Sequence, residues 1–254
     1  VLTDKRFVNP AKDDMYLQNV VTEDRMVVQS LEKKGLRVYR THWDDPEVDW
    51  TSTKNLLFRT TWDYHHRFDE FSNWLKDVNS KTNVINPYEL ILWNQDKHYL
   101  KELDQQGINI PSTIFMEKGE NHRLLDLFER TNFSEAIIKP TVSAAARDTY
   151  RIKREDAKKN EILLKNNLPL ESMLFQEFQE QIATKGELSI VVFGGKFSHA
   201  VLKKSKPGDF RVQDYWGGTL HEYQASDKEI ELAEHIVSLI NPKPVYARVD
   251  LMWD

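Results

Sequence analysis

The sequence of 254 residues contains no cysteine, which excludes disulfide bonds, thiolate metal sites and a cysteine nucleophile. It also lacks any apolar run approaching the roughly 18–20 residues that a membrane-spanning helix needs, and no signal peptide is visible. The net charge of -5 offers no broad basic surface for nucleic acid. We therefore predict a soluble, cytoplasmic protein that binds neither membranes nor nucleic acid.

Glycine is scarce as well, and its placement excludes two familiar phosphate-binding loops. The chain has only 9 glycines, and they form neither a G-x-G-x-x-G fingerprint nor a P-loop. A hydrophobic fraction of 40% is still sufficient for real cores, and the length fits one large domain or two to three small ones. Any phosphate site must therefore be built from other loops.

The segment of residues 174–218 carries the densest chemical pattern. An apolar strand leads to an isolated acid, Glu187, and then to a hairpin whose turn is Gly194-Gly195. The four cations that follow are Lys203, Lys204, Lys206 and Arg211. Cations in loops are often only solvated, but these precede Gly217-Gly218, and glycine lets backbone N–H groups approach an anion. The segment therefore predicts a site for a phosphorylated ligand.

The N-terminal part of the chain alternates between strand and helix patterns. Strand patterns cover residues 1–3, 36–40 and 55–60, and helix patterns cover residues 22–34 and 69–78. This alternation predicts a small parallel α/β domain. Residues 59–64 (RTTWDY) follow a strand, where α/β sheets place ligands. The alternative is that the Trp and Tyr of this motif only cover the edge of the sheet.

Two lysines are candidates for phosphate contacts. Lys97 lies near the start of a helix that follows a link over residues 88–94, and a lone helical lysine is usually solvated. Lys139 closes an apolar strand over residues 136–140 and precedes the small-residue loop TVSAAARDT of residues 141–149. A lysine in that position can reach a phosphate while the loop folds over it, or it can simply reach water.

The last strand pattern, YARVDLMWD, follows a helix that a capping box of Ser226 and Glu229 starts. Alternation places Arg248 and Asp250 on one face of this strand. They can form an ion pair that only stabilises the sheet. The functional alternative makes Asp250 an oxygen ligand for Mg²⁺ and Arg248 a clamp on a transferred phosphate.

Taken together, these motifs resemble the ATP-grasp superfamily, in its glutathione-synthetase-like and ribosomal-protein glutamate ligase-like branch. The ordered set is NQD before Lys97, IIKP at Lys139, LFQEFQ, GELS at Glu187, GDFRVQ with a following GG, and RVD at residues 248–250. RTTWDY, SAAARDT and FSHAV further resemble a narrower bacterial group that includes the O-ureido-serine cyclo-ligase of cycloserine biosynthesis. The resemblance covers nearly the whole chain.

This resemblance implies an α/β and α+β architecture. A small parallel α/β domain over residues 1–93 would precede an ATP-grasp fold, in which two α+β lobes grip ATP. The small lobe with its linker helix would cover residues 94–178, and the large lobe residues 179–254. In this family, further Mg²⁺ ligands, a Glu and an Asn, lie on a strand after the RVD strand. Either such a strand lies beyond residue 254 or metal binding is incomplete; we expect the first, and we expect the start at Val1 to be clipped.

The resemblance also implies roles for individual residues. Two lysines would contact the α- and β-phosphates of ATP, a loop would close over them, and the hinge between the lobes would hold adenine next to an acid that takes the ribose hydroxyls. These ATP-binding residues would be Lys97, Lys139, Ser143, Ala144, Arg147, Gln176, Glu177, Phe178, Gln179 and Glu187. Lys203 and Arg211 would face the γ-phosphate and the acyl substrate. Arg248 would stabilise the transferred phosphoryl group, and Asp250 would bind Mg²⁺.

The implied activity is a carboxylate–amine ligase that uses ATP and Mg²⁺, forms an acyl phosphate and lets an amine attack it. Its partners would be small-molecule carboxylate and amine substrates, and relatives often form homo-oligomers. One alternative is a non-catalytic ATP-binding protein with a regulatory or assembly role. Another is a grasp-type kinase that phosphorylates a small molecule without ligating it.

Overall fold

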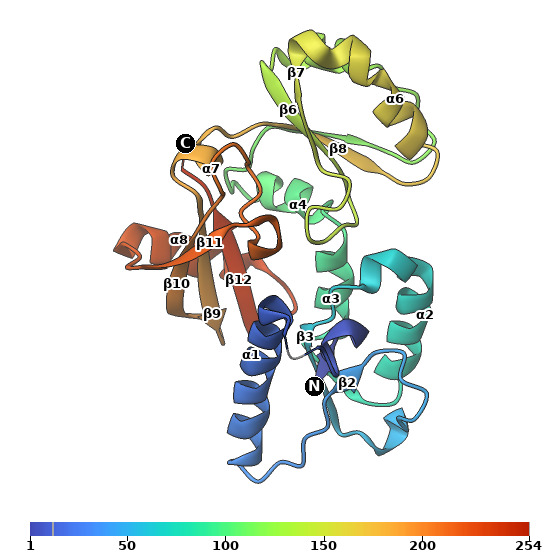
Figure 1. Cartoon of the computed structure of the whole chain (residues 1–254), viewed down its shortest axis with the longest axis vertical. Helices are drawn as coiled ribbons and strands as arrows, with labels where there is room; N and C mark the ends of the chain where they lie inside the picture. Colours follow the sequence, from blue (N-terminus) through green and yellow to red (C-terminus); the bar gives the residue numbers. More distant parts are fainter. Residues whose placement is uncertain (12, 254) are drawn as a thin grey trace. The chain divides into compact units, whose positions relative to one another are not determined.

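The computed structural model describes residues 1–11 and 13–253, which form two compact units. Unit 1 comprises Val1–Ile91 together with Asn241–Tyr246. Unit 2 comprises Leu92–Ile240 and the residues from Ala247 onward. Figure 1 colours the elements of both units in chain order, from blue at the start to red at the end.

Unit 1 is built around a four-stranded sheet of order β2-β1-β3-β4, in which all paired strands run parallel. The amphipathic helix α2 buries Phe71, Leu75 and Val78 against it, next to the fully buried Trp43. The elements are β1 (Leu2–Thr3), η1 (Lys5–Phe7), α1 (Met15–Glu32), β2 (Thr41–His42), η2 (Trp50–Ser52), β3 (Asn55–Thr60), η3 (Tyr64–Arg67), α2 (Phe68–Asn79), β4 (Asn83–Ile85) and α3 (Tyr88–Gln95). The predicted small parallel α/β domain is confirmed.

Three expectations in this part of the chain are wrong. The first helix begins at Met15 rather than residue 22, because the Asp14 side chain accepts the Leu17 N–H and caps it. Residues 36–40 are not a strand: Leu36 and Tyr39 are 52% and 63% exposed, and the strand that pairs with β1 starts only at Thr41. The link expected over residues 88–94 is helical, since it lies within α3.

A buried ion pair joins α1 to the sheet. The carboxylate of Asp24 is fully buried and lies 2.8 Å from Arg40 Nε, while Thr60 Oγ1 donates to it at 3.3 Å. Arg59 Nε lies 3.7 Å from the other carboxylate oxygen. A buried charge is tolerated only with such partners, so this network holds α1 in place.

Replacing Asp24 by alanine should lower the free energy of unfolding by roughly 3–5 kcal/mol, because the change leaves Arg40 buried without its partner. Urea unfolding followed by circular dichroism measures the loss. The control is Glu23→Ala, which removes a carboxylate that is 68% exposed and 3.8 Å from Arg59. That variant should lose at most about 1 kcal/mol. Equal losses in the two variants would show that the buried ion pair contributes no more to the free energy of unfolding than the exposed one.

The RTTWDY motif packs inside unit 1. Trp62 stands edge-on to Phe7 with ring centroids 5.5 Å apart, and the Trp43 indole donates to Asp63 at 3.0 Å. The Tyr246 hydroxyl, from the short return of the chain into this unit, donates to the carbonyl of Phe58. Tyr64 packs against the core of unit 1 next to Phe71, so both aromatic residues of the motif have structural contacts. A binding role for the motif stays a prediction.

Unit 2 contains two four-stranded antiparallel sheets, and the first has the order β5-β8-β6-β7. Helices α5 and α6 cover one face of it, visible for α6 in Figure 1. Ala136, Ile138 and Phe175 point into that core. Its elements are β5 (Thr113–Met116), α5 (Leu124–Thr131), β6 (Glu135–Pro140), β7 (Tyr150–Lys153), η4 (Arg154–Asp156), α6 (Ala157–Asn167) and β8 (Met173–Glu177). The predicted strand over residues 136–140 is confirmed as β6, which begins one residue earlier.

The second sheet of unit 2 has the order β11-β10-β9-β12. Helix α8 packs on one face through Ala233 and Val237, and the Ser226–Glu229 capping box that starts this helix is confirmed. Its elements are α7 (Gln181–Thr184), β9 (Glu187–Phe193), β10 (Lys196–Lys204), η5 (Asp214–Trp216), β11 (Thr219–Tyr223), α8 (Asp227–Leu239) and β12 (Tyr246–Leu251). The predicted hairpin with its Gly194-Gly195 turn forms β9 and β10, whereas β11 has no counterpart among the predicted strands.

Helix α4 (Tyr99–Gln105) precedes β5 of the first sheet and packs against the second sheet. It buries Leu103 against Ile236 of α8 and Leu251 of β12. Lys97 therefore lies in the short connection between α3 and α4, two residues ahead of the helix it was expected to start. This placement brings it to the loop after β6.

Candidate functional site

Lys139 and Gln176 share the face of the first sheet that points away from its core. Because Ala136 and Ile138 face inward, alternation along β6 turns Lys139 to the opposite face. There its ammonium donates to Gln176 Oε1 at 3.0 Å, and Gln176 Nε2 donates to Thr113 Oγ1 at 2.8 Å. Three neighbouring strands thus fix the direction of the Lys139 side chain.

Lys97 holds the loop that follows β6. Its backbone N–H donates to the Thr141 carbonyl at 3.0 Å. Its ammonium donates to Ser143 twice, to the carbonyl and to Oγ, both at 2.9 Å. We call residues 141–149 the phosphate loop, after the role predicted for it. In this structure, Lys97 and the loop are already in contact.

The phosphate loop contains no glycine, yet three of its residues adopt left-handed backbone conformations. The φ angles are 52° at Ala145, 59° at Ala146 and 47° at Asp148. Each costs roughly 1–2 kcal/mol for a residue with a Cβ atom, so the loop needs external support. Arg147 supplies part of it: it donates to both carboxylate oxygens of Glu171, at 2.9 and 2.6 Å. The Arg147 N–H also closes a turn onto the Ala144 carbonyl at 3.0 Å.

The two lysines make this region a concentrated site of positive charge. Burial lowers the pKa of Lys97 to about 7, and the charge of Lys139 acts in the same direction. Burial also lowers the pKa of Lys139 to about 8, against an opposing effect of Glu187. The charged forms are costly here in the free protein, and a polyphosphate would remove that cost.

Nucleotide binding should therefore take up protons, because bound phosphates raise the pKa of both lysines. Between about pH 7 and about pH 9 the free lysines lose their charge, and the affinity for Mg·ATP should fall across this window. Calorimetric titration in two buffers with different ionisation enthalpies counts the protons taken up. An affinity that stays constant over the window would contradict the assignment of these lysines.

The expected adenine hinge, residues 176–179, is ordered by contacts on both sides. The Glu177 N–H donates to the Ser112 carbonyl at 2.9 Å, and Gln179 Nε2 lies 3.5 Å from the Glu177 carbonyl. The Phe178 ring is only 8% exposed: the Arg151 guanidinium lies over it at 3.7 Å and the Phe210 ring meets it edge-on at 5.9 Å. Little of this ring is open to a ligand in the present conformation.

Four charged residues meet on the face of the second sheet that points away from α8. Lys203 lies directly across from Glu187 in the β9–β10 pairing, and its ammonium donates to that carboxylate at 2.8 Å. The same ammonium lies 3.4 Å from Asp250 Oδ1. Arg248 donates to both oxygens of Asp250, from Nε and Nη2, each at 2.8 Å. The ion pair that the sequence left open as an alternative is therefore present, and it is part of a larger network.

Ser189 completes this network and was missed by the sequence reasoning. Its buried hydroxyl donates to Asp250 Oδ1. Burial alone would raise the pKa of Asp250, but the charges of Arg248 and Lys203 outweigh it and lower the pKa to about 2. Asp250 is thus a carboxylate at neutral pH, as a metal ligand must be. The alternation of Glu187 and Ser189 on one strand face was the available signal.

Asp250 fits the predicted Mg²⁺ only as part of a ligand set. Among the side chains that the structure describes, no three His, Asp or Glu groups are arranged to hold a metal ion. Mg²⁺ in nucleotide sites is commonly held by one or two carboxylates, with phosphates and water as the other ligands. The Asp250 oxygens suit that use, while Arg248, Lys203 and Ser189 compete for them in the free protein.

Arg211 lies apart from this network. Asp209 accepts from its Nε at 3.0 Å and from its Nη2 at 2.7 Å, and the guanidinium stacks over the Trp216 ring at 3.7 Å. The Arg211 charge and hydrogen bonds hold the pKa of Asp209 well below its usual range. No contact between Arg211 and Lys203 occurs within the described part of the chain, so their predicted joint role would need a ligand between them.

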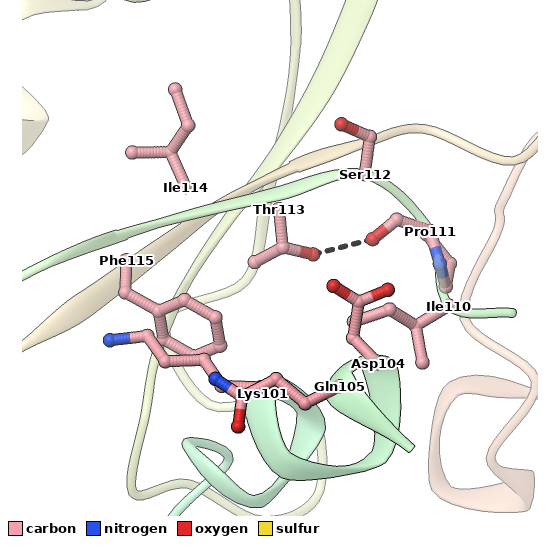
Figure 2. A pocket seen from close by; sticks show the side chains of 9 residues that line it. All are labelled: Lys101, Asp104, Gln105, Ile110, Pro111, Ser112, Thr113, Ile114 and Phe115. Carbon is pink, nitrogen blue, oxygen red and sulfur yellow. Dashed lines mark hydrogen bonds between the residues drawn. The ribbon is translucent and has the colours of Figure 1, made fainter. Parts of the chain in front are cut away.

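A separate hollow of about 600 Å³ lies between α4 and β5 (Figure 2). Lys101 and Asp104 line it from the helix, and Thr113 and Phe115 from the strand. None of its nine lining residues is among the predicted ATP ligands. Two of its lining residues bond to the predicted adenine hinge: Thr113 accepts from Gln176 Nε2, and the Ser112 carbonyl accepts from the Glu177 N–H.

The two parts of the chain match two different family descriptions. The family description "RimK-like ATP-grasp domain" matches residues 94–254. The description "D-cycloserine synthetase DcsG, N-terminal domain" matches residues 1–86. A curated relative, the cycloserine biosynthesis protein DcsG of Streptomyces lavendulae, is 29% identical over 175 residues. That alignment covers 66% of this chain and 58% of the relative, so the match spans less than two thirds of the relative's length.

Solved structures support the same fold. The crystal structure of the D-cycloserine synthetase DcsG superposes with a TM-score of 0.80 at 23% identity, covering 92% of this chain and 82% of that one. A D-alanine–D-alanine ligase from Bacillus anthracis gives 0.63 at 15% identity, covering 95% and 79%. A RimK domain ATP-grasp protein from Sphaerobacter thermophilus gives 0.66 at 13% identity, covering 91% and 82%. The predicted ATP-grasp fold is confirmed. In the described part of the chain, no helix combines the length and apolarity that a membrane span requires.

Proposed function

Because the chain belongs to the RimK-like ATP-grasp family, we propose that it is an ATP-dependent ligase that joins a small carboxylate to an amine. The observation that carries this proposal is the network of Glu187, Lys203, Arg248 and Asp250 on one sheet face. In the same unit, Lys139 lies on the other sheet, and Lys97 holds the loop that follows its strand. A protein that kept this fold without binding a nucleotide would not need two desolvated lysines or this cluster of paired side chains.

In the proposed reaction, a carboxylate oxygen of the substrate attacks the γ-phosphorus of ATP, and ADP leaves. The product is an acyl phosphate. The amine nitrogen then attacks the acyl carbon, the C–O bond to phosphate breaks, and the nitrogen loses a proton as the amide and inorganic phosphate form. No protein nucleophile is needed, so positioning and positive charge carry the catalysis.

Each residue of the site has a place in this scheme. Lys97 and Lys139 hold the α- and β-phosphates, with the phosphate loop of Ser143, Ala144 and Arg147 above them. Arg248 stabilises the charge that develops on the transferred phosphoryl group, since a guanidinium presents several N–H donors to it. Lys203 and Arg211 face the γ-phosphate and the carboxylate.

The nucleotide and metal contacts complete the assignment. Residues 176–179 hold adenine by their backbone and by Gln176, and Glu187 takes the ribose hydroxyls after it releases Lys203. Asp250 holds Mg²⁺, which supplies charge neutralisation at the phosphates when it is bound. In the free protein, Lys203 pairs with Glu187 and Arg248 pairs with Asp250. The phosphates of a bound nucleotide pair with these two cations instead and release both carboxylates.

The proposed substrate is small and resembles an amino acid. The N-terminal match to the D-cycloserine synthetase domain supports this choice, because cycloserine is itself a cyclic amino-acid derivative. A ring closure within one molecule and a ligation of two molecules use the same two chemical steps. The site contacts therefore serve either route.

Release of ADP in the presence of pooled amino acids and amines tests the proposal. We expect ADP formation that depends on at least one carboxylate pool and that Arg248→Ala abolishes. The control variant is Arg154→Ala, which removes an exposed arginine from η4, directly after β7. Nucleotide binding without any stimulated turnover would instead identify a non-catalytic ATP-binding protein.

A further inference from the structure

The segment of residues 209–218 is built as a rigid frame around Arg211. Asp209 holds the guanidinium through two oxygens, and the Trp216 ring lies against its face at 3.7 Å. The glycine at its end is required by close packing, since a Cβ atom at Gly218 would lie 2.1 Å from the Val212 carbonyl oxygen. We refer to residues 209–218 as the substrate segment.

The substrate segment contacts the predicted nucleotide site at two points. The Trp216 indole donates its N–H to the carbonyl of Ala145, in the phosphate loop, at 3.2 Å. Phe210 meets the Phe178 ring of the hinge edge-on, with centroids 5.9 Å apart. Ala145 and Trp216 are 71 residues apart in the sequence, so their hydrogen bond ties together two loops from different sheets.

The hydrogen bond to the Ala145 carbonyl supports the part of the phosphate loop whose backbone is strained. Ala145 and Ala146 are both left-handed, a conformation that alanine holds only where its surroundings over-determine it. Lys97 supports the loop at Ser143 and Glu171 supports it at Arg147. Trp216 supplies the support between these two points, at the strained residues themselves.

We propose that Trp216 is a positioning residue that couples the substrate segment to the phosphate loop, so that a carboxylate ligand at Arg211 and a nucleotide at the loop strengthen each other's binding. A guanidinium suits a carboxylate, and because Arg211 stacks on the indole, a carboxylate ligand that engages Arg211 also restrains Trp216. Such coupling is reciprocal, because a change in one affinity requires the same change in the other. The inference rests on the proposed function for the identity of the ligands.

The test uses Trp216→Phe, which keeps an aromatic ring for Arg211 and removes the indole N–H together with the second ring of the indole. The matched control is Trp93→Phe, which removes another indole hydrogen bond of unit 2, the one to Glu102 at 2.8 Å. Hydrogen exchange with mass spectrometry follows the phosphate loop and the substrate segment in each protein. It is recorded without ligand and with Mg·AMPPNP, a nucleotide that is not hydrolysed.

In the free protein, Trp216→Phe should speed amide exchange in the phosphate loop by roughly two- to tenfold, as expected for the loss of one hydrogen bond. Trp93→Phe should leave the loop unchanged. With Mg·AMPPNP, the wild type should gain protection in both segments, and Trp216→Phe in the phosphate loop only. The coupling would be overturned if the phosphate loop exchanged equally fast in the free wild type and free Trp216→Phe. It would also be overturned if Mg·AMPPNP protected the substrate segment equally in these two proteins. If Mg·AMPPNP protects neither segment of the wild type, the proposed function fails, while the exchange of the free proteins still decides the role of Trp216.

Discussion

Replacing Lys139 by methionine is expected to weaken Mg·ATP binding by about 10- to 100-fold, the loss of one charge-assisted hydrogen bond to a phosphate. Methionine fills a similar volume and carries no charge. The control is Lys153→Met, on the neighbouring strand β7, where the lysine is exposed. Calorimetric titration with Mg·AMPPNP measures both affinities, and equal affinities in the two variants would remove Lys139 from the nucleotide site.

The same substitution should not destabilise the free protein, which separates binding from folding. Burial lowers the pKa of Lys139 from 10.5 to about 8, so the unfolded chain binds the proton more strongly than the folded one. Stability of the wild type should therefore rise with pH between these two values, as the buried charge is lost. Lys139→Met lacks that contribution. Thermal unfolding across this range should show a shallower pH dependence for the variant.

Replacing Asp250 by asparagine is expected to lower turnover by roughly 10²- to 10³-fold, the usual cost of losing one preorganised electrostatic contact at the reacting phosphate. Asparagine keeps the shape of the side chain but loses the charge that Mg²⁺ requires. It also releases Arg248 and Lys203 from the partner that positions them. ADP release at saturating substrates measures the effect.

The loss of stability in Asp250→Asn should be much smaller than the loss of activity. Arg248 is 58% exposed, and ion pairs with an exposed partner contribute about 0–1 kcal/mol to folding. Glu222→Gln is the matched control, a charge removed from exposed β11 on the same sheet. A stability loss in Asp250→Asn large enough to account for the lost turnover would favour a purely structural ion pair.

The sequence predicted the elements of unit 2 well because their signals are local. The strand ending at Lys139, the hairpin around Gly194-Gly195 and the capping box at Ser226 each depend on residues a few positions apart. The wrong strand prediction in unit 1 has a different cause, because it depends on strand pairing. Residues 36–40 have strand-forming side chains, but only a pairing partner decides where a strand lies, and β1 pairs with Thr41 and His42 instead.

In the candidate site too, residues in local motifs were predicted and residues that depend on distant partners were missed. Lys97, Lys139, Glu187 and Asp250 were found as motif positions, and the structure places them in contact with neighbouring polar groups. Ser189, Glu171 and Trp216 were missed, because each acts through a partner far away in the sequence. A serine on a strand or a tryptophan before a glycine pair carries no signal until folding brings its partner within hydrogen-bond distance.

Oxygen-isotope transfer shows whether a carboxylate is activated as an acyl phosphate. The active carboxylate, once found by ADP release from the pools, is labelled with ¹⁸O in its carboxyl group and incubated with the protein, Mg·ATP and amine. One ¹⁸O atom is expected in the released inorganic phosphate, observed by ³¹P NMR, because the carboxylate oxygen that attacks phosphorus leaves with it. Unlabelled phosphate, or a stable phosphorylated substrate without amide, would rule out ligation through an acyl phosphate.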